Sequence, residues 1–168
     1  MITPAYAQTM ARYNVWQNDN IYRSAAKLRD EERNSGRGAF FGSIHATLNH
    51  ILWADQMWLV RFKAASPPRA KSISEGLVQF PEWADLAAER LKLDALITEW
   101  AARLTEADLA ADLKWFSAGA ARDMVTPMTI AVTHFFNHQT HHRGQVHCLL
   151  TGLGVKPSLT DLPFLGIA

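Results

Sequence analysis

The sequence predicts an all-α fold, a single four-helix bundle with long connections and a short C-terminal tail. Four long stretches place apolar residues at helical spacing, and strand patterns are scarce. The chain has 168 residues, 48% of them hydrophobic, which suffices for one sizeable core. No repeat, low-complexity tract or shift of composition divides it. We therefore expect residues 1–168 to form one domain.

The first two helices have recognisable starts. Thr3 offers a capping hydroxyl and Pro4 suits the first helical position, so a helix is expected from about residue 4 to about residue 30. A loop rich in glycine, residues 34–38, follows it. The second helix should begin near Ser43 and cover about residues 42–62. Because it is apolar on most sides, it should be widely buried.

The remaining chain is expected to form two more helices and the segments between them. A connection over about residues 63–82 precedes a third helix over about residues 83–104. The segment from Leu113 to Met124 is either a tiny hairpin or a loop. Thr126 and Pro127 repeat the cap-and-proline start and open the fourth helix, which should run to about Thr151. The tail after Lys156 should pack back on the bundle through its apolar residues Leu162, Phe164, Leu165 and Ile167.

Composition and charge exclude several classes of protein. The chain carries 17 basic and 16 acidic side chains without a basic block, which argues against nucleic-acid binding. It has neither the pattern of a secretory signal nor the roughly 18 apolar residues of a membrane helix. The single cysteine, Cys148, excludes an internal disulfide, fits a reducing compartment and is expected to be a small buried hydrophobe. We therefore expect a cytoplasmic protein that binds no membrane.

The expected fourth helix collects five of the seven histidines, in the stretch HFFNHQTHHRGQVH over residues 134–147. At about 100° per residue, His134 and His142 each lie about 40° from His138, and His141 lies about 60° away. Apolar and small residues continue this stripe, which indicates that it faces the interior or a cleft. Buried imidazoles need partners, and the backbone of a helix has none to spare. A metal ion would satisfy them, although an isolated pair of histidines is commonly an ordinary surface or core feature.

Two histidines four residues apart on a helix can share one metal ion. The pairs His134/His138 and His138/His142 both have this spacing, and spacing does not choose between them. A third ligand must come from another helix. We prefer His50 to His45, because His45 lies about 140° away and nearer the helix start, where solvent is expected. Asp55 should be a paired structural carboxylate, with Arg12, Arg143 or backbone amides as its partners.

Three segments of the chain resemble the DinB/YfiT-like superfamily of bacterial proteins, many of them proposed metalloenzymes. (This DinB is unrelated to the polymerase that shares the name.) The segments are YNVWQN over residues 13–18, FFGSI with TLNHILWAD over residues 40–55, and HFFNHQTHHRGQ over residues 134–145. The resemblance covers nearly the whole chain, and the last two segments are highly specific.

The resemblance implies a four-helix bundle and a metal ion held by three histidines. Carried over residue by residue, it places the ligands at His50, His138 and His142, and leaves His134 and His141 beside them. The superfamily includes transferases that use low-molecular-weight thiols, a thiol-dependent maleylpyruvate isomerase, proposed hydrolases and members of no known activity. It therefore implies a site more than a substrate.

Three neutral imidazoles leave coordination positions open, as in catalytic zinc sites. We expect one divalent ion per chain, zinc by preference, with nickel, iron or manganese as alternatives. It would activate a thiol or water towards a small electrophile, as in a thiol S-transferase or a hydrolase. His141 or His134 would act as the general base, or else orient the ligands.

Several polar and aromatic residues are candidates for a substrate pocket. Trp16, Trp53 and Trp58 either line an apolar pocket or pack in the core, and Asn14 is either a pocket group or an interior hydrogen-bonding group. The alternative to an enzyme is a non-catalytic metal-binding protein of the stress response. The apolar face that carries Val132, Phe136 and Leu150 is either bundle core or a dimer surface. We also expect a homodimer through helix faces, because the second and fourth helices are apolar on two sides.

Overall fold

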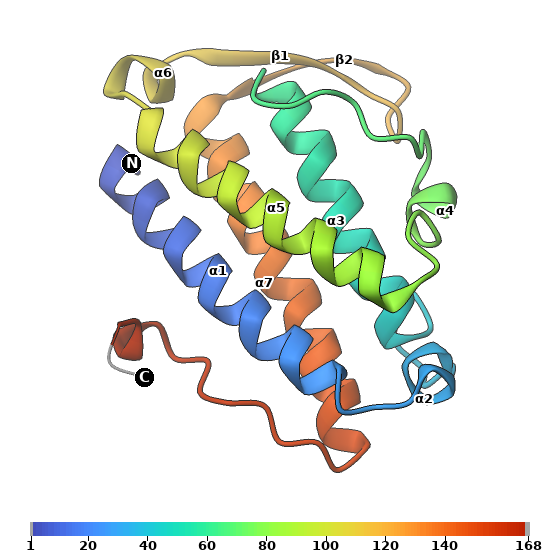
Figure 1. Ribbon diagram of the computed structural model, residues 1–168. Coiled ribbons are helices and arrows are strands. Elements are labelled where there is room, and N and C mark those ends of the chain that lie inside the picture. Colours follow the sequence, from blue (N-terminus) through green and yellow to red (C-terminus); the bar gives the residue numbers. More distant parts are fainter. Residues whose placement is uncertain (1, 167–168) are drawn as a thin grey trace.

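Four long helices lie side by side in the computed structural model, which describes residues 2–166 (Figure 1). They are α1 (Pro4–Ala25), α3 (Ile44–Arg61), α5 (Trp83–Arg103) and α7 (Met128–Gly152). Helix α1 packs against α5 and α7, and α3 packs against the same two helices. Their apolar side chains form one core. Within residues 2–166, no helix combines the length and the apolar character that crossing a membrane requires.

The segment after α5 forms a hairpin, one of the two alternatives that the sequence left open, so the all-α expectation holds only as a mostly helical fold. Strands β1 (Asp112–Ser117) and β2 (Arg122–Pro127) form an antiparallel hairpin, with Trp115 opposite Met124. Leu113 and Trp115 turn towards the helices, whereas Phe116 is exposed. The chain is therefore mostly helical with a small sheet. The short helices are α2 (Asp30–Asn34), α4 (Ile73–Gly76), α6 (Glu106–Ala110) and the 3-10 turn η1 (Leu162–Phe164).

Helix α1 begins as predicted but ends earlier. The Thr3 hydroxyl accepts a hydrogen bond from the amide of Tyr6, as a capping residue does. The helix stops at Ala25 instead of continuing to about residue 30. The buried guanidinium of Arg33 donates to the carbonyl oxygens of Ala25 and Leu28. Arg33 thus contacts the backbone of the turn that follows the helix, and helical periodicity alone does not reveal this contact.

The start of α7 also differs from the prediction. Pro127 is the last residue of β2 and the N-cap of α7, and no side chain caps this helix. The hydroxyl of Thr126 instead accepts a hydrogen bond from the indole of Trp115 at 3.1 Å. Thr126 therefore ties the hairpin together and does not cap the helix. Ser43, by contrast, caps α3 as predicted, because its hydroxyl accepts from the amide of Ala46.

The C-terminal tail returns along α1, as Figure 1 shows, but polar contacts hold it there. Asn20 exchanges two hydrogen bonds with the backbone of Ser158, at 2.7 and 3.1 Å. Tyr13 and Gln17 donate to the carbonyls of Thr160 and Leu159. Of the apolar residues expected to bury the tail, Leu162 and Phe164 are exposed, Leu165 is partly buried and Ile167 lies outside the described residues.

Val132, Phe136 and Leu150 are buried inside the chain, which is the bundle-core alternative, so this face offers no surface for a second copy. One further burial prediction is wrong. Cys148 was expected to be buried and is exposed instead. It projects beside the ligand stripe of α7, where neighbouring helices do not cover it.

A network of charged side chains crosses the centre of the core. Arg90 of α5 contacts Asp55 of α3 at 2.7 Å and Asp94 at 2.8 Å, and all three are buried. The amide of Gln139 donates to Asp55 at 2.9 Å. Burial alone would lower the pKa of Arg90, but Asp94 and Asp55 outweigh burial and raise it. Asp55 is thus a paired structural carboxylate as predicted, although its cationic partner is Arg90 rather than Arg12 or Arg143.

We predict that Arg90→Met destabilises the fold by about 3–5 kcal/mol, because it leaves two carboxylates buried without their cation. The free energy of unfolding from urea denaturation measures the loss. The matched control is Arg23→Met, since Arg23 pairs with Asp19 on the exposed face of α1. That variant should lose less than about 1 kcal/mol. Equal losses in the two variants would contradict a special role for the buried network.

Candidate metal centre

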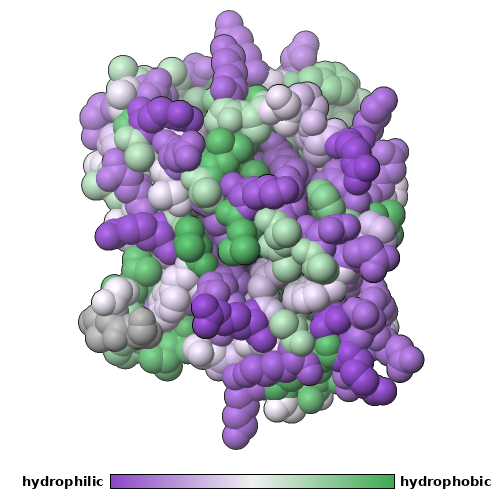
Figure 2. All heavy atoms as spheres, in the orientation of Figure 1, coloured by the Kyte–Doolittle hydropathy of each residue, from purple (hydrophilic) through white to green (hydrophobic). Residues whose placement is uncertain are grey.

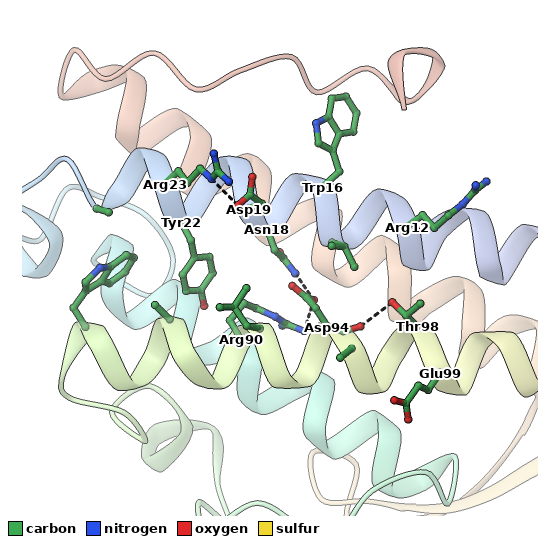
Figure 3. A pocket seen from close by; sticks show the side chains of 16 residues that line it. Arg12, Trp16, Asn18, Asp19, Tyr22, Arg23, Arg90, Asp94, Thr98 and Glu99 are labelled. Atoms are coloured by element: carbon green, nitrogen blue, oxygen red, sulfur yellow. Dashed lines mark hydrogen bonds and ion pairs between the residues drawn. The ribbon is translucent and has the colours of Figure 1, made fainter. Parts of the chain in front are cut away.

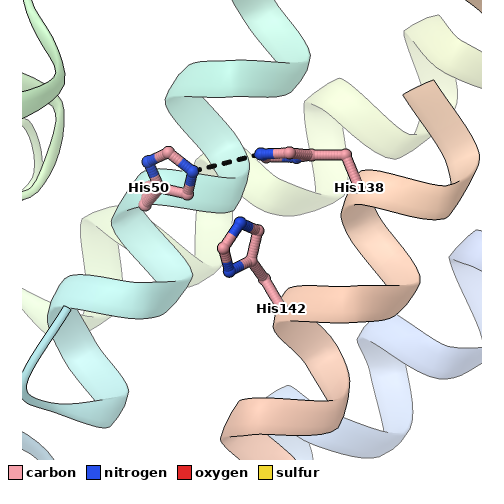
Figure 4. A group of neighbouring side chains, drawn as sticks. All are labelled: His50, His138 and His142. Carbon is pink, nitrogen blue, oxygen red and sulfur yellow. Dashed lines mark hydrogen bonds between the residues drawn. The ribbon is translucent and has the colours of Figure 1, made fainter. Parts of the chain in front are cut away.

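Three histidines converge between α3 and α7. Figure 4 shows His50 on α3 facing His138 and His142, which lie one turn apart on α7. One ring nitrogen from each lies within 4.8 Å of the other two. The structure therefore brings together the three residues that the resemblance implied, across a separation of 88 positions in the chain between His50 and His138.

The spacing of these nitrogens fits a shared metal ion. The Nε2 atoms of His50 and His138 are 3.2 Å apart. Two nitrogens bound to one tetrahedral zinc ion at its usual bond length are about 3.3 Å apart. The Nδ1 atoms of both rings are buried and have no hydrogen-bond partner among the described residues. A divalent ion would occupy the facing lone pairs and would fix both rings as Nδ1–H tautomers.

Electrostatics keep these imidazoles neutral, which is the form that binds metal. Burial, together with the charge that His142 would carry, lowers the pKa of His50 to about 4. Burial and the neighbouring histidines lower the pKa of His138 to about 3. Burial also lowers the pKa of His142, although the hydrogen bond between its ring and the amide oxygen of Gln145 acts to raise it. At neutral pH, protons therefore compete little with a metal ion for these nitrogens.

Gln145 orients one ligand and links it to a further histidine. Its Oε1 lies 2.9 Å from Nδ1 of His142, which directs Nε2 of that ring towards the centre. Its amide nitrogen lies 3.2 Å from Nε2 of His141. His141 itself is exposed, and its ring is 4.8 Å from that of His142. This position at the rim suits a residue that exchanges protons with solvent.

His134 lies one turn before His138 on α7 and away from His50. Its ring is 5.6 Å from that of His138 and 5.0 Å from that of Trp58. Burial and the nearby charge of Arg61 lower its pKa. Of the two pairs that spacing allowed, His138/His142 meets His50 and His134/His138 does not.

Aromatic side chains form the walls beside the centre. Trp53, a predicted pocket residue, has its ring 6.2 Å from that of His50 and donates to the carbonyl of Ala70. Phe41 packs closest, with its ring centroid 4.0 Å from His50 and 5.3 Å from His142. Phe41 lies in the segment FFGSI, but no role in the site was predicted for it. The sequence offers one signal that the loop turns at Phe41, because Gly42 follows directly. Gly42 has a φ of +81° and leads into α3.

Two predicted pocket residues lie elsewhere. The amide of Asn14 is fully buried and donates to Asp94 at 2.9 Å, so Asn14 is one of the interior groups. Trp16 lines a separate groove of about 980 Å³ between α1 and α5, whose floor includes Arg90 and Asp94 (Figure 3). His45 is buried rather than near solvent, and its Nε2 lies 2.8 Å from the carbonyl of Phe80. It stays outside the cluster, as predicted.

Comparisons with known proteins agree with this fold. The family model described as "DinB family" matches residues 1–166. The chain is similar to the protein DinB of Bacillus subtilis (strain 168), with 23% identity over 159 residues that cover 93% of this chain and 91% of the relative. A crystal structure of a DinB-like protein from Bacillus cereus ATCC 10987 superposes with a TM-score of 0.64 and 19% identity. That match covers 86% of this chain and 91% of the other.

We predict that the protein binds one zinc ion per chain and that alanine at His50, His138 or His142 abolishes stoichiometric binding. Each substitution removes one of three convergent nitrogens. Isothermal titration of the chelator-treated, untagged protein measures the stoichiometry. The matched control is His45→Ala, on the same helix but outside the cluster, which should bind as the unmodified chain does. Full binding by the His50 variant would disprove the assignment.

Removal of the ion should leave the helices intact, because the apolar core is large enough to fold without it. Circular dichroism of the chelated protein checks this point. A disordered apoprotein would make the centre a structural one.

Proposed function

This chain belongs to the DinB family, and we propose that it is a metal-dependent enzyme that activates a thiol or water for attack on a small electrophile. The observation that carries the proposal is the convergence of three neutral imidazoles beside aromatic walls. Catalytic zinc sites characteristically have three protein ligands and an open position. We place the activity with thiol S-transferases or hydrolases.

The ion that best suits three imidazoles is zinc, and nickel, iron and manganese are the alternatives. When bound, it would retain its double positive charge, because none of the three ligands is anionic, and would lower the pKa of a thiol or water. The thiolate is the nucleophilic form of a thiol. A low-molecular-weight thiol and a small electrophile are therefore the proposed substrates.

The remaining steps fall to the side chains around the centre. His141, at the solvent rim, and His134, beside Trp58, are the candidates to accept the proton released by the nucleophile. Either imidazole is a suitable base only while neutral. Phe41 and Trp53 would exclude water from one side of the reacting atoms and would hold the apolar part of the electrophile.

We predict that a thiol added to cobalt-loaded protein produces a sulfur-to-cobalt charge-transfer band. The reason is that three histidine ligands leave room for a further donor. Absorption spectroscopy measures the band, and His138→Ala should lose it together with any turnover. Activity should rise with pH through a single ionisation, because only the deprotonated nucleophile reacts.

A different outcome would favour a different function. If thiols leave the cobalt spectrum unchanged, and ester, amide and electrophile panels show no turnover above free metal, the enzyme proposal fails. A non-catalytic metal-binding protein of the stress response would then replace it. A closed centre, with His141 or His134 as the fourth ligand, would support that function.

We also propose a homodimer through the groove between α1 and α5, because the face that carries Val132, Phe136 and Leu150 is core. The groove exposes Val15 and Leu91, and Figure 2 shows apolar side chains among polar ones on the face of the molecule that Figure 1 presents. Burial of this surface against a second copy would remove apolar area from water.

Light scattering should give the mass of two chains at micromolar concentration, and Leu91→Glu should give that of one. Val78→Glu is the control, because Val78 is about equally exposed but lies outside the groove. A monomeric unmodified chain would exclude the dimer.

A further inference from the structure

Arg61, the last residue of α3, is a partly buried cation without an acidic partner. Its guanidinium carbon lies 4.4 Å from the ring centroids of both Trp58 and Trp115. The two indole rings are 5.3 Å apart and inclined at 54°, so the guanidinium lies against both. Among residues 2–166, no carboxylate lies within ion-pair distance of it. Three other arginines are buried, and each has a hydrogen-bond partner: Arg33, Arg90 and Arg143.

This arrangement leaves the charge of Arg61 incompletely compensated. Indole faces attract a cation, but they carry no net charge. The carbonyls at the end of α3 supply about half of a unit negative charge. Burial lowers the pKa of Arg61, and no neighbouring acid raises it back. An anion from outside the chain would therefore gain from this position without displacing a protein carboxylate.

The position lies in line with the metal centre. Arg61 follows His50 by eleven residues, which brings it to within about 20° of the same face of α3. Helix α7 runs in the opposite direction to α3. His142 and His138 therefore face His50, and the earlier residue His134 faces Trp58. Three contacts of 5.6, 5.0 and 4.4 Å connect His138 to Arg61 through His134 and Trp58.

We propose that Arg61 is the subsite for a carboxylate group on a substrate whose other end reaches the three-histidine centre. The proposal rests on the function proposed above and specifies its substrate class: an elongated small molecule with a carboxylate at one end. A guanidinium presents paired N–H donors in the geometry of a carboxylate, so it selects this group over a neutral hydroxyl. Trp58 and Trp115 would hold the guanidinium in place and would contact the apolar part of the molecule.

The structure also suggests a purely architectural role for Arg61, as a clamp between α3 and the hairpin. Trp115 belongs to β1, and its contact with Arg61 helps to seat β1 on the helices. A clamp would stabilise the fold without any preference among ligands. The two roles therefore differ in ligand selectivity, and an experiment that compares charged with neutral ligands separates them.

The test uses cobalt-loaded protein and two series of linear thiols of increasing length, one ending in a carboxylate and the other in a hydroxyl. The intensity of the sulfur-to-cobalt band against thiol concentration gives the affinity of each. Carboxylates long enough to reach Arg61 should bind at least about tenfold more tightly than the alcohols of equal length, as a charge-assisted pair does. Short carboxylates should show no such preference.

Arg61→Met should abolish the tighter binding of long carboxylate thiols relative to long hydroxyl thiols. The substitution retains an apolar side chain and removes the charge. Arg122→Met is the matched control, since Arg122 is an exposed cation on β2 of the same hairpin, and it should retain the preference. Equal affinities of the two series for the unmodified protein would overturn the proposal. So would an unchanged preference in the Arg61 variant.

A second measurement keeps this inference separate from the metal chemistry. If no thiol gives a cobalt band, the thiol route of the proposed function fails, but Arg61 can still be examined in metal-free protein. Long linear carboxylates should then shift the indole N–H resonances of Trp58 and Trp115, and the corresponding alcohols should not. Absence of that shift would overturn the subsite, and the same spectra show whether the Arg61 variant retains the seated hairpin.

Discussion

The packing of α3 against α7 is the constraint on which the rest of the structure depends. The two helices run antiparallel: His50 of α3 contacts His138 of α7, and the later residue Trp58 contacts the earlier residue His134. In the interior, Gln139 donates to Asp55, and Asp55 in turn pairs with Arg90 of α5. Gln139 directly follows His138 in the chain. The buried hydrogen bond thus sets the register of the helices where the histidines must meet, because any slip would break it.

The polar groups of the core fall into two kinds, and the difference separates structure from function. The interior network of Asp55, Arg90 and Asp94 balances its charges internally, through two ion pairs and several amide hydrogen bonds. Such a network stabilises one arrangement of the helices and leaves little capacity for a ligand. The histidine cluster contains no acid to balance a charge, and the Nε2 atoms of His50 and His138 face each other at 3.2 Å. Facing imidazole nitrogens of this kind can bind one metal ion together.

The extent to which the sequence predicted this molecule depended on the range of the interactions involved. Local signals placed α3 and α5 to within about two residues, because capping and periodicity act within a few positions. The end of α1 was missed because it depends on Arg33, which reaches back from α2. The tail returned as expected, yet through Asn20 and backbone carbonyls rather than apolar residues. A pattern of apolar residues carries no information about such polar contacts.

The candidate site shows the same limit. Helical arithmetic placed His134, His138 and His142 on one stripe but left the choice of pair open, because only the facing helix distinguishes them. Resemblance to a family supplied that choice in advance, and the geometry of His50 gives the physical reason.

The resemblance included Phe41 in the segment FFGSI but gave it no role, although its ring packs against His50 from a loop. Neither spacing nor resemblance pointed to Arg61, which contacts Trp115 of the hairpin. Both contacts join segments that are separate in the chain. The chemistry of each side chain depends on a group that is missing from it or from its surroundings. Phe41 offers no polar atom to the centre, and Arg61 has no acid to neutralise it. Under the proposed function, the apolar wall of Phe41 and the charge of Arg61, eleven residues beyond His50 on α3, would select the substrate more than the histidines, because any ligand with a soft donor could approach those.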